Sequence, residues 1–400
     1  MTTSPPAAAA AADSGDDKPE SRLVDGEAPT GDPIVSVIFG MTFDVDKDGG
    51  CSAKGYRIVE EWTYVKARVA TKFTKPSLLV RDTDLYAWRN LTDVVVQGTA
   101  RSDSPVKSMQ VALTVSGSDA KFERPLIVTG DRWVDARRGT ATLSDPEPFT
   151  EMPLTYDRAY GGTDEVAEER FADPELLNFF VTQIDPRENE ELSEFSYPRN
   201  PAGRGYLVDD GGLRGLAWPN LEFPESRLKL DSVVQPLERW GERPYPAGFD
   251  WFAHAWFPRQ AFALDFPETH DEKIPEVERK LGLFEPGFEQ KTIPERPKHP
   301  FANGAHPYLA RRRLNGTETI RVTKTSRDGR DFFAKLPGLV PKVTLRLPGE
   351  PKVVLPAALD LVFVETELDQ VTLLWRATHF TKKEHVPMEW LYGTDYDIAY

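Results

Sequence analysis

The chain has 400 residues, 40% hydrophobic and 28% charged, a composition typical of a globular protein with a large core. Its formal net charge of -15 argues against a nucleic-acid partner, because an acidic surface repels the phosphate backbone. The single cysteine, Cys51, excludes an intramolecular disulfide, and no apolar run is long enough to predict a membrane span.

Residues 1–31 are predicted to form a disordered tail. An alanine run lies there among serine, proline, aspartate and glycine, and no lysine or arginine precedes Lys18. A secretory signal needs a basic start and a longer apolar stretch, so we expect no export by that route. The tail also has too few large apolar residues to offset the entropy cost of becoming ordered.

Residues 32–146 are predicted to form an N-terminal β region. Order is expected from Ile34, and apolar residues alternate with others as far as Val45, which is the period of a half-buried strand. Acidic and glycine residues predict a turn at 46–50. Further strand candidates are 56–69, 77–80, 93–100, 108–116 and 121–128. Their spacing indicates an antiparallel β-sandwich or an open, barrel-like scaffold.

Residues 147–312 are predicted to be a loop-rich central insertion, because proline and glycine interrupt every regular pattern there. Two short helix candidates cover 174–181 and 275–281. A long irregular tract in a compact domain usually has a function such as binding. Strands return in a C-terminal β region, 313–400, at 318–323, 332–336, 342–347, 358–365 and 370–379. The sequence therefore predicts a mainly β domain over 32–400 with few short helices.

One acidic cluster resembles part of a calcium loop. Asp44, Asp46, Asp48 and Gly49 match its first half, in which oxygen ligands alternate before a glycine bend. The bidentate glutamate of such a loop would stand at position 55, which is Gly55. We therefore expect a polar hairpin turn and no metal there.

The other polar residues form no recognisable catalytic motif, and we expect no cofactor. The six histidines lack metal-ligand spacing, and His254 is expected to be packed or hydrogen-bonded. Arg204, Arg259 and Arg376 are expected to hold loop carbonyls and carboxylates by bidentate hydrogen bonds. A carbohydrate-active or other hydrolytic enzyme is an alternative, because the central tract is rich in acidic and aromatic residues.

Several short motifs, in order over roughly residues 35 to 380, resemble the bacterial family known as domain of unknown function 2169 (DUF2169), which occurs in type VI secretion gene clusters. The motifs that carry the resemblance include Gly130-Asp131-Arg132, Met152-Pro153-Leu154, Tyr156-Asp157-Arg158-Ala159-Tyr160-Gly161-Gly162, Asn200-Pro201-Ala202-Gly203-Arg204-Gly205-Tyr206, Pro219-Asn220-Leu221-Glu222-Phe223-Pro224, Trp256-Phe257-Pro258-Arg259 and Leu374-Trp375-Arg376. The chain departs from the family at Asp250, where glycine is expected, and over 261–310, which lacks the family's proline-aspartate-glutamine motif.

The resemblance implies a non-catalytic adaptor or chaperone in the cytoplasm of the producing cell. Such a protein binds a toxic effector and assists its loading onto the secreted spike, so the implied partners are an effector and the spike protein, with neither nucleic acid nor membrane. A structural scaffold protein of the same gene cluster is a further alternative. If the chain is an adaptor, rigid, proline-braced aromatic loops are displayed to grip another polypeptide.

The motif residues are expected to hold the fold more than to touch a partner. Four glycines should supply positive φ angles or close backbone approach: Gly161, Gly162, Gly203 and Gly205. Asn200 and Asn220 should close turns, and Asp157, Arg158 and Glu222 should form a partly buried ion network. The complete set of candidate site residues is Asp131, Arg132, Tyr156, Asp157, Arg158, Tyr160, Gly161, Gly162, Asn200, Pro201, Gly203, Gly205, Asn220, Glu222, Trp256 and Arg259.

Overall fold

The computed structural model describes most of the β regions and part of the central insertion. The described residues are 19–28, 30–67, 77–89, 91–117, 121–137, 140–164, 196–197, 199–207, 215–233, 243–254, 256, 259, 303–306, 308–311 and 313–400. Both predicted helices, 174–181 and 275–281, lie outside these residues, as does most of the divergent stretch 261–310. Among the described helices, none is long and apolar enough to span a bilayer.

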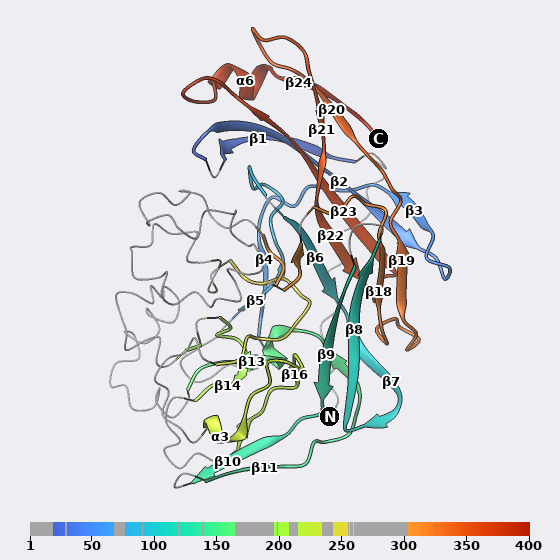
Figure 1. The fold of residues 1–400 in the computed structure, drawn as a ribbon, viewed down its shortest axis with the longest axis vertical. Coiled ribbons are helices and arrows are strands. Elements are labelled where there is room, and N and C mark those ends of the chain that lie inside the picture. Colours follow the sequence, from blue (N-terminus) through green and yellow to red (C-terminus); the bar gives the residue numbers. More distant parts are fainter. Residues whose placement is uncertain are drawn as a thin grey trace.

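The largest sheet joins strands from the two ends of the chain (Figure 1). In spatial order its strands are β1 (Ser21–Glu27), β2 (Pro33–Val45), β23 (Gln370–Phe380), β22 (Ala358–Glu365), β6 (Thr92–Gln97) and β17 (Ala310–Arg311), with β3 (Cys51–Lys54) also paired to β2. β22 and β6 run parallel, whereas the other pairs are antiparallel. The β2–β23 register extends from Ile34 opposite Phe380 to Asp44 opposite Gln370.

A second, antiparallel sheet lies beside the first and shares its core. Its order is β16 (Leu221–Glu222), β9 (Lys121–Thr129), β8 (Ser108–Ser116), β18 (Thr319–Val322) and β19 (Phe332–Lys335). One cluster of buried apolar side chains includes residues of both sheets, such as Phe39 on β2, Leu113 on β8 and Trp375 on β23. β18 and β19 alternate between buried and more exposed residues, whereas β2 is buried on both faces over residues 34–40.

Smaller sheets extend this framework. They are β21 (Val353–Pro356) with β20 (Lys342–Arg346) and β24 (Asp395–Ala399); β11 (Thr140–Leu143) with β10 (Trp133–Arg137) and β15 (Leu216–Ala217); β12 (Phe149–Pro153) with β7 (Thr99–Val106); β13 (Tyr160–Gly161) with β14 (Arg204–Gly205); and β4 (Thr63–Lys66) with β5 (Ser77–Arg81). The described helices are the 3-10 turn η1 (Tyr156–Arg158), α3 (Leu230–Val233) and α6 (Met388–Gly393). The mainly β architecture with antiparallel sheets and few short helices confirms the predicted fold class.

Order begins earlier than the sequence predicted. The expected disordered tail contains β1, which pairs with β2 from Ser21 opposite Phe39 to Glu27 opposite Pro33. Only Leu23 and Val24 in β1 are large and apolar, so the strand has no readable period and depends on the edge that β2 offers.

Two other predicted strands are also wrong in extent. Within the described part of the candidate at 56–69, residues 56–67, only β4 is a strand. Tyr56 lies outside it and is buried, and its hydroxyl donates to Asp84 Oδ2. The candidate at 93–100 divides at Gly98 into β6 and β7, which belong to different sheets. A Cβ at Gly98 would lie 2.2 Å from Thr366 Oγ1, so a glycine allows this change of sheet.

The predicted turn at 46–50 is confirmed. It joins β2 to β3, and Asp46 Oδ1 accepts hydrogen bonds from the backbone N–H groups of Asp48 and Gly50, each at 2.8 Å. The acidic residue is therefore used to close its own turn.

Candidate functional site

The central motifs meet at a loop junction, which we define as η1 and β13 packed against residues 199–207 and 215–223. β13 and β14 pair in parallel, with Tyr160 opposite Arg204 and Gly161 opposite Gly205. The buried Asn200 side chain joins the two segments, because its Nδ2 donates to the carbonyls of Tyr156 at 2.8 Å and of Tyr160 at 3.0 Å.

The glycines of this junction have the predicted roles. Gly161, Gly162 and Gly205 have φ angles of 146°, 97° and 92°. A Cβ on Gly161 would lie 2.1 Å from the Asn200 carbonyl oxygen, and one on Gly203 would lie 2.7 Å from the Ala159 carbonyl oxygen. Both the positive φ angles and the close backbone approach are therefore confirmed.

Asp131 is the acidic centre of the junction. Its Oδ1 accepts hydrogen bonds from Arg158 at 3.0 Å, from Arg204 at 3.1 Å and from Asn220 Nδ2 at 3.0 Å. Asn220 Nδ2 also donates to the Thr129 carbonyl at 2.9 Å. The two asparagines therefore connect segments far apart in the chain, and the prediction that their side chains close local turns is wrong.

The predicted network of Asp157, Arg158 and Glu222 is also wrong in its pairing. Arg158 pairs with Asp131, whereas the buried Glu222 pairs with Arg132 at 2.9 Å and with Arg227 at 3.3 Å. The Asp157 carboxylate instead accepts a hydrogen bond from Thr155 Oγ1 at 2.6 Å. The pairs with Asp131 and Arg132 join residues that are close in space but far apart in the sequence, so proximity in the sequence did not predict them.

The three arginines hold carbonyls and carboxylates as predicted, but each divides its hydrogen bonds between a carbonyl and a carboxylate, so the predicted bidentate geometry is wrong. Arg204 Nε donates to the Asp157 carbonyl at 3.0 Å, in addition to its contact with Asp131. Arg259 Nη1 donates to the Phe252 carbonyl at 2.6 Å, and its Nη2 lies 3.0 Å from Asp82 Oδ2. Arg376 pairs with Asp360 at 2.6 Å and donates to the Tyr86 carbonyl.

The remaining candidates are placed mainly in the interior. Trp256 packs edge-on against Tyr156 with ring centroids 5.5 Å apart, and Tyr160 packs against Tyr197 at 5.0 Å. Pro201 is half-buried in the turn after Asn200. His254, as predicted, is a packed side chain that stacks on the Trp62 ring and hydrogen-bonds the Tyr64 hydroxyl.

Most aromatic residues of the central insertion are buried where the structure describes them. Buried aromatic residues of this region are Tyr156, Tyr160, Tyr197, Tyr206, Trp218, Phe223, Tyr245, Phe249, Trp251, Phe252, Trp256 and Tyr308. The Trp251 ring, for example, packs 5.4 Å from Phe363 on β22. The expectation that these aromatic loops are displayed is therefore wrong for the buried residues, whereas Phe149 is half-buried. They contribute instead to the core of the β framework, because burying large rings is strongly favourable.

Asp250, the departure from the family pattern, is buried at the base of this segment. Its Oδ1 accepts hydrogen bonds from Gln97 Nε2 at 2.9 Å and from the Trp251 N–H at 2.7 Å. The pKa of Asp250 is raised to about 7, mainly by burial; the hydrogen bonds from Gln97 and the Trp251 N–H oppose this rise, and the negative charge of Asp157 adds to it.

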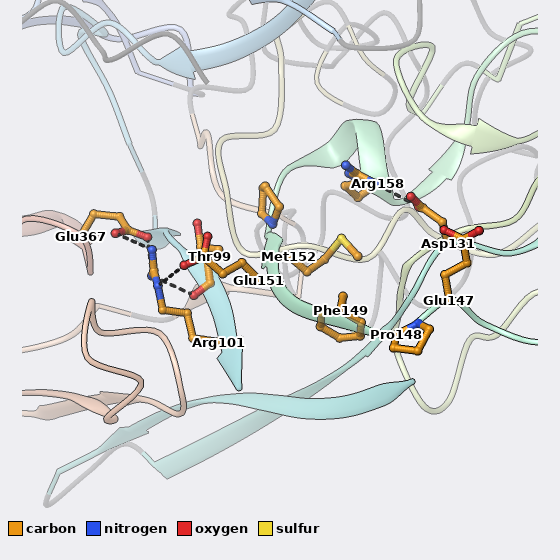
Figure 2. A pocket seen from close by; sticks show the side chains of 11 residues that line it. Thr99, Arg101, Asp131, Glu147, Pro148, Phe149, Glu151, Met152, Arg158 and Glu367 are labelled. Carbon is orange, nitrogen blue, oxygen red and sulfur yellow. Dashed lines mark hydrogen bonds and ion pairs between the residues drawn. The ribbon is translucent and has the colours of Figure 1, made fainter. Parts of the chain in front are cut away.

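The motif network reaches the surface at a pocket of about 510 Å³ beside β7 and β12. Figure 2 shows Arg101 and Glu367 at one end, Arg158, Asp131, Glu147 and Pro148 at the other, and Met152 and Phe149 between them. We call this cavity the β12 pocket. Its lining residues are Thr99, Arg101, Asp131, Glu147, Pro148, Phe149, Glu151, Met152, Pro153, Arg158 and Glu367.

Both ends of the β12 pocket are ion pairs. Arg101 makes a two-pronged contact with Glu367, at 2.6 Å and 3.0 Å, and its Nε lies 3.3 Å from Glu151 Oε1. At the other end, Arg158 contacts Asp131. Such paired charges fix the shape of the opening, because each guanidinium holds its carboxylate in a defined orientation.

Sequence reasoning identified Asp131 and Arg158 but missed Arg101, Glu147 and Glu367. Arg101 and Glu367 are 266 positions apart, and neither belongs to a motif that sequence spacing could reveal. The parallel pairing of β22 with β6, which leads into β7, brings the β22–β23 turn that carries Glu367 close to Arg101.

Residues 30–376 match a family model described as "Uncharacterized protein conserved in bacteria (DUF2169)". No curated protein and no solved structure matches the chain. The matched region contains the loop junction and the β12 pocket, and it ends before α6 and β24.

Proposed function

Because the chain belongs to the bacterial DUF2169 family, we propose that it is a non-catalytic adaptor that binds a type VI secretion effector and assists its loading onto the secreted spike. The motifs that resemble proteins of type VI secretion gene clusters support this role. Binding takes place in the cytoplasm of the producing cell, before the effector is secreted.

The proposal rests on one observation: motif residues reach the surface at the β12 pocket. Tyr156, Asn200 and Asn220 are buried and hold loops together, whereas Asp131 and Arg158 line the β12 pocket. A cavity of about 510 Å³ is large enough for a few side chains of another polypeptide. Because its walls are already fixed by ion pairs, little conformational entropy is lost when it is occupied.

A pull-down of the tagged full chain with each product of the neighbouring genes tests this function. We expect an effector or the spike protein to be retained on the tagged chain and to be absent from beads that carry an unrelated protein. Retention of neither partner would contradict the adaptor role. The hydrolytic alternative has no specific observation in its favour among the described residues and stays a prediction.

A further inference from the structure

The floor of the β12 pocket is apolar. Met152 is buried, Phe149 and Pro153 are half-buried, and Pro148 is exposed, so the floor offers a hydrocarbon surface that is partly in contact with water. Covering this surface with an apolar side chain is favourable, because it removes hydrocarbon from water. The floor alone does not distinguish one apolar ligand from another.

The rim of the same pocket is acidic. Glu147 and Glu151 flank the floor, and both are exposed. Among the described residues, no cation pairs with the Glu147 carboxylate, whereas Glu151 shares Arg101 with Glu367. Asp131 and Glu367 are matched by arginines at the two ends. The carboxylates that lack a full cationic partner are therefore concentrated on the rim.

The pocket is rigid enough to select its ligand by position. Met152 and Pro153 of β12 pair with Ala100 and Thr99 of β7, and Leu154 N donates to the Gly98 carbonyl at 3.0 Å. The backbone of Glu147 is held next to Asp131, because the Glu147 N–H donates to the Asp131 carbonyl at 2.9 Å. An apolar floor and a negative rim are thus held at a fixed separation.

We propose that the β12 pocket binds a segment of the client polypeptide in which a bulky apolar side chain stands beside a lysine or arginine. The apolar side chain covers Phe149 and Met152, and the neighbouring basic side chain reaches Glu147 or Glu151, which lie toward opposite ends of this floor in Figure 2. This inference rests on the proposed function only in assigning the segment to a secretion client. The net charge of -15 favours the same occupant, because a basic segment is attracted at long range and an anionic ligand is repelled.

Selection of peptides from a randomised display library on the full chain tests the inference. We expect enriched peptides to combine an apolar residue with a neighbouring lysine or arginine. The affinity of one enriched peptide is then measured for the wild type and for the double variant Glu147→Gln/Glu151→Gln. Loss of the exposed charge contact, whichever of the two carboxylates makes it, should weaken binding roughly fivefold.

A matched control variant is Glu384→Gln/Glu389→Gln, which makes the same change in net charge at two exposed residues elsewhere. It should bind the peptide like the wild type. The inference is overturned if no peptide is enriched, if basic residues are not enriched, or if the control variant loses as much affinity as the pocket variant.

The same two variants separate this inference from the proposed function in a pull-down with the neighbouring gene products. A client retained equally by the wild type and by the pocket variant contradicts the pocket assignment and leaves the adaptor role standing. A different outcome is that neither chain retains a client, while peptides with basic and apolar residues still bind in a way that depends on Glu147 and Glu151. This outcome contradicts the adaptor role and supports the pocket assignment.

Discussion

Asn200 shows how one small side chain can hold the loop junction. Its amide nitrogen donates to two carbonyls of the segment that contains η1, and its own backbone carbonyl accepts from the Gly162 and Gly203 N–H groups. A glycine at position 161 is needed because the Asn200 backbone passes so close. The dense pattern of asparagine and glycine in the motifs therefore has a packing cause.

Gly161→Ala is expected to destabilise the protein by more than about 3 kcal/mol, because it combines a φ angle that only glycine adopts readily with a steric clash. Gly349→Ala is the matched control: its φ is 76°, and nothing lies within 4 Å of the place that its Cβ would occupy. We expect it to cost about 1 kcal/mol, which is the backbone strain alone. Urea unfolding of both variants measures the difference, and equal losses would contradict the close approach at Gly161.

Asp250 should make stability depend on pH. Its folded pKa of about 7 lies above the unfolded value of about 3.9, so the folded state binds more protons between these values. Stability is therefore expected to fall as pH rises through this window and to level off above it.

Asp250→Asn removes the charge and keeps an oxygen that can accept from Gln97 and from the Trp251 N–H. At about pH 8 the variant should be more stable than the wild type by roughly 1–4 kcal/mol, and the difference should shrink as pH approaches about 4. Denaturant unfolding at the two pH values measures this. A stability difference that does not change with pH would show that Asp250 is not held in an unfavourable charged state.

At the scale of elements, β1 and β3 cover one edge of β2. β1 pairs with residues 33–39 of β2, and β3 pairs with residues 42–45, while β23 occupies the opposite edge. β2 is largely buried, and an uncovered edge of this kind is a template for pairing with other chains. The short N-terminal strand thus protects the longest strand of the sheet.

Truncation of residues 1–28 should lower the free energy of unfolding by about 2 kcal/mol or more and promote aggregation, because it removes β1 from this edge. Truncation of residues 1–18 leaves β1 in place and should change neither property. Thermal unfolding and light scattering compare the two chains. Indistinguishable behaviour of the two truncations would contradict the edge-protecting role of β1.

The elements that could be predicted from the sequence are those with a buried face. β20 alternates because it buries every second side chain, whereas β2 and β23 are long, apolar-rich strands buried on both faces over most of their length. β1, β24 and the β10–β11 hairpin have few buried apolar residues and were missed. These strands form because neighbouring strands offer partners for their backbone hydrogen bonds. Their own sequences show too little alternation of apolar and polar residues to predict a strand.

For the candidate site, the roles of the glycines could be predicted from the sequence, but the partners of the charged residues could not. Glycine roles could be inferred because the residue type itself limits the explanations, and the structure confirms them at Gly161 and Gly203. The partners of charged residues could not, since Arg158 meets Asp131 and Arg101 meets Glu367 only after the sheets assemble. The burial of the aromatic loops was missed for the same reason.

At the scale of the whole molecule, a single apolar core joins both large sheets to the central aromatic residues. The loop junction is thus a part of the framework, and the β12 pocket is an opening at its surface. The proposed adaptor role assigns client binding to that opening. The acidic charge of the molecule then favours clients with basic segments.

The most direct test of this account is the soluble yield of a neighbouring effector expressed with and without the full chain. We predict that the effector becomes more soluble when the chain is present and co-purifies with it, which also distinguishes a chaperone from a passive scaffold. An unchanged soluble yield, with no co-purification of any effector from the gene neighbourhood, would contradict the central claim.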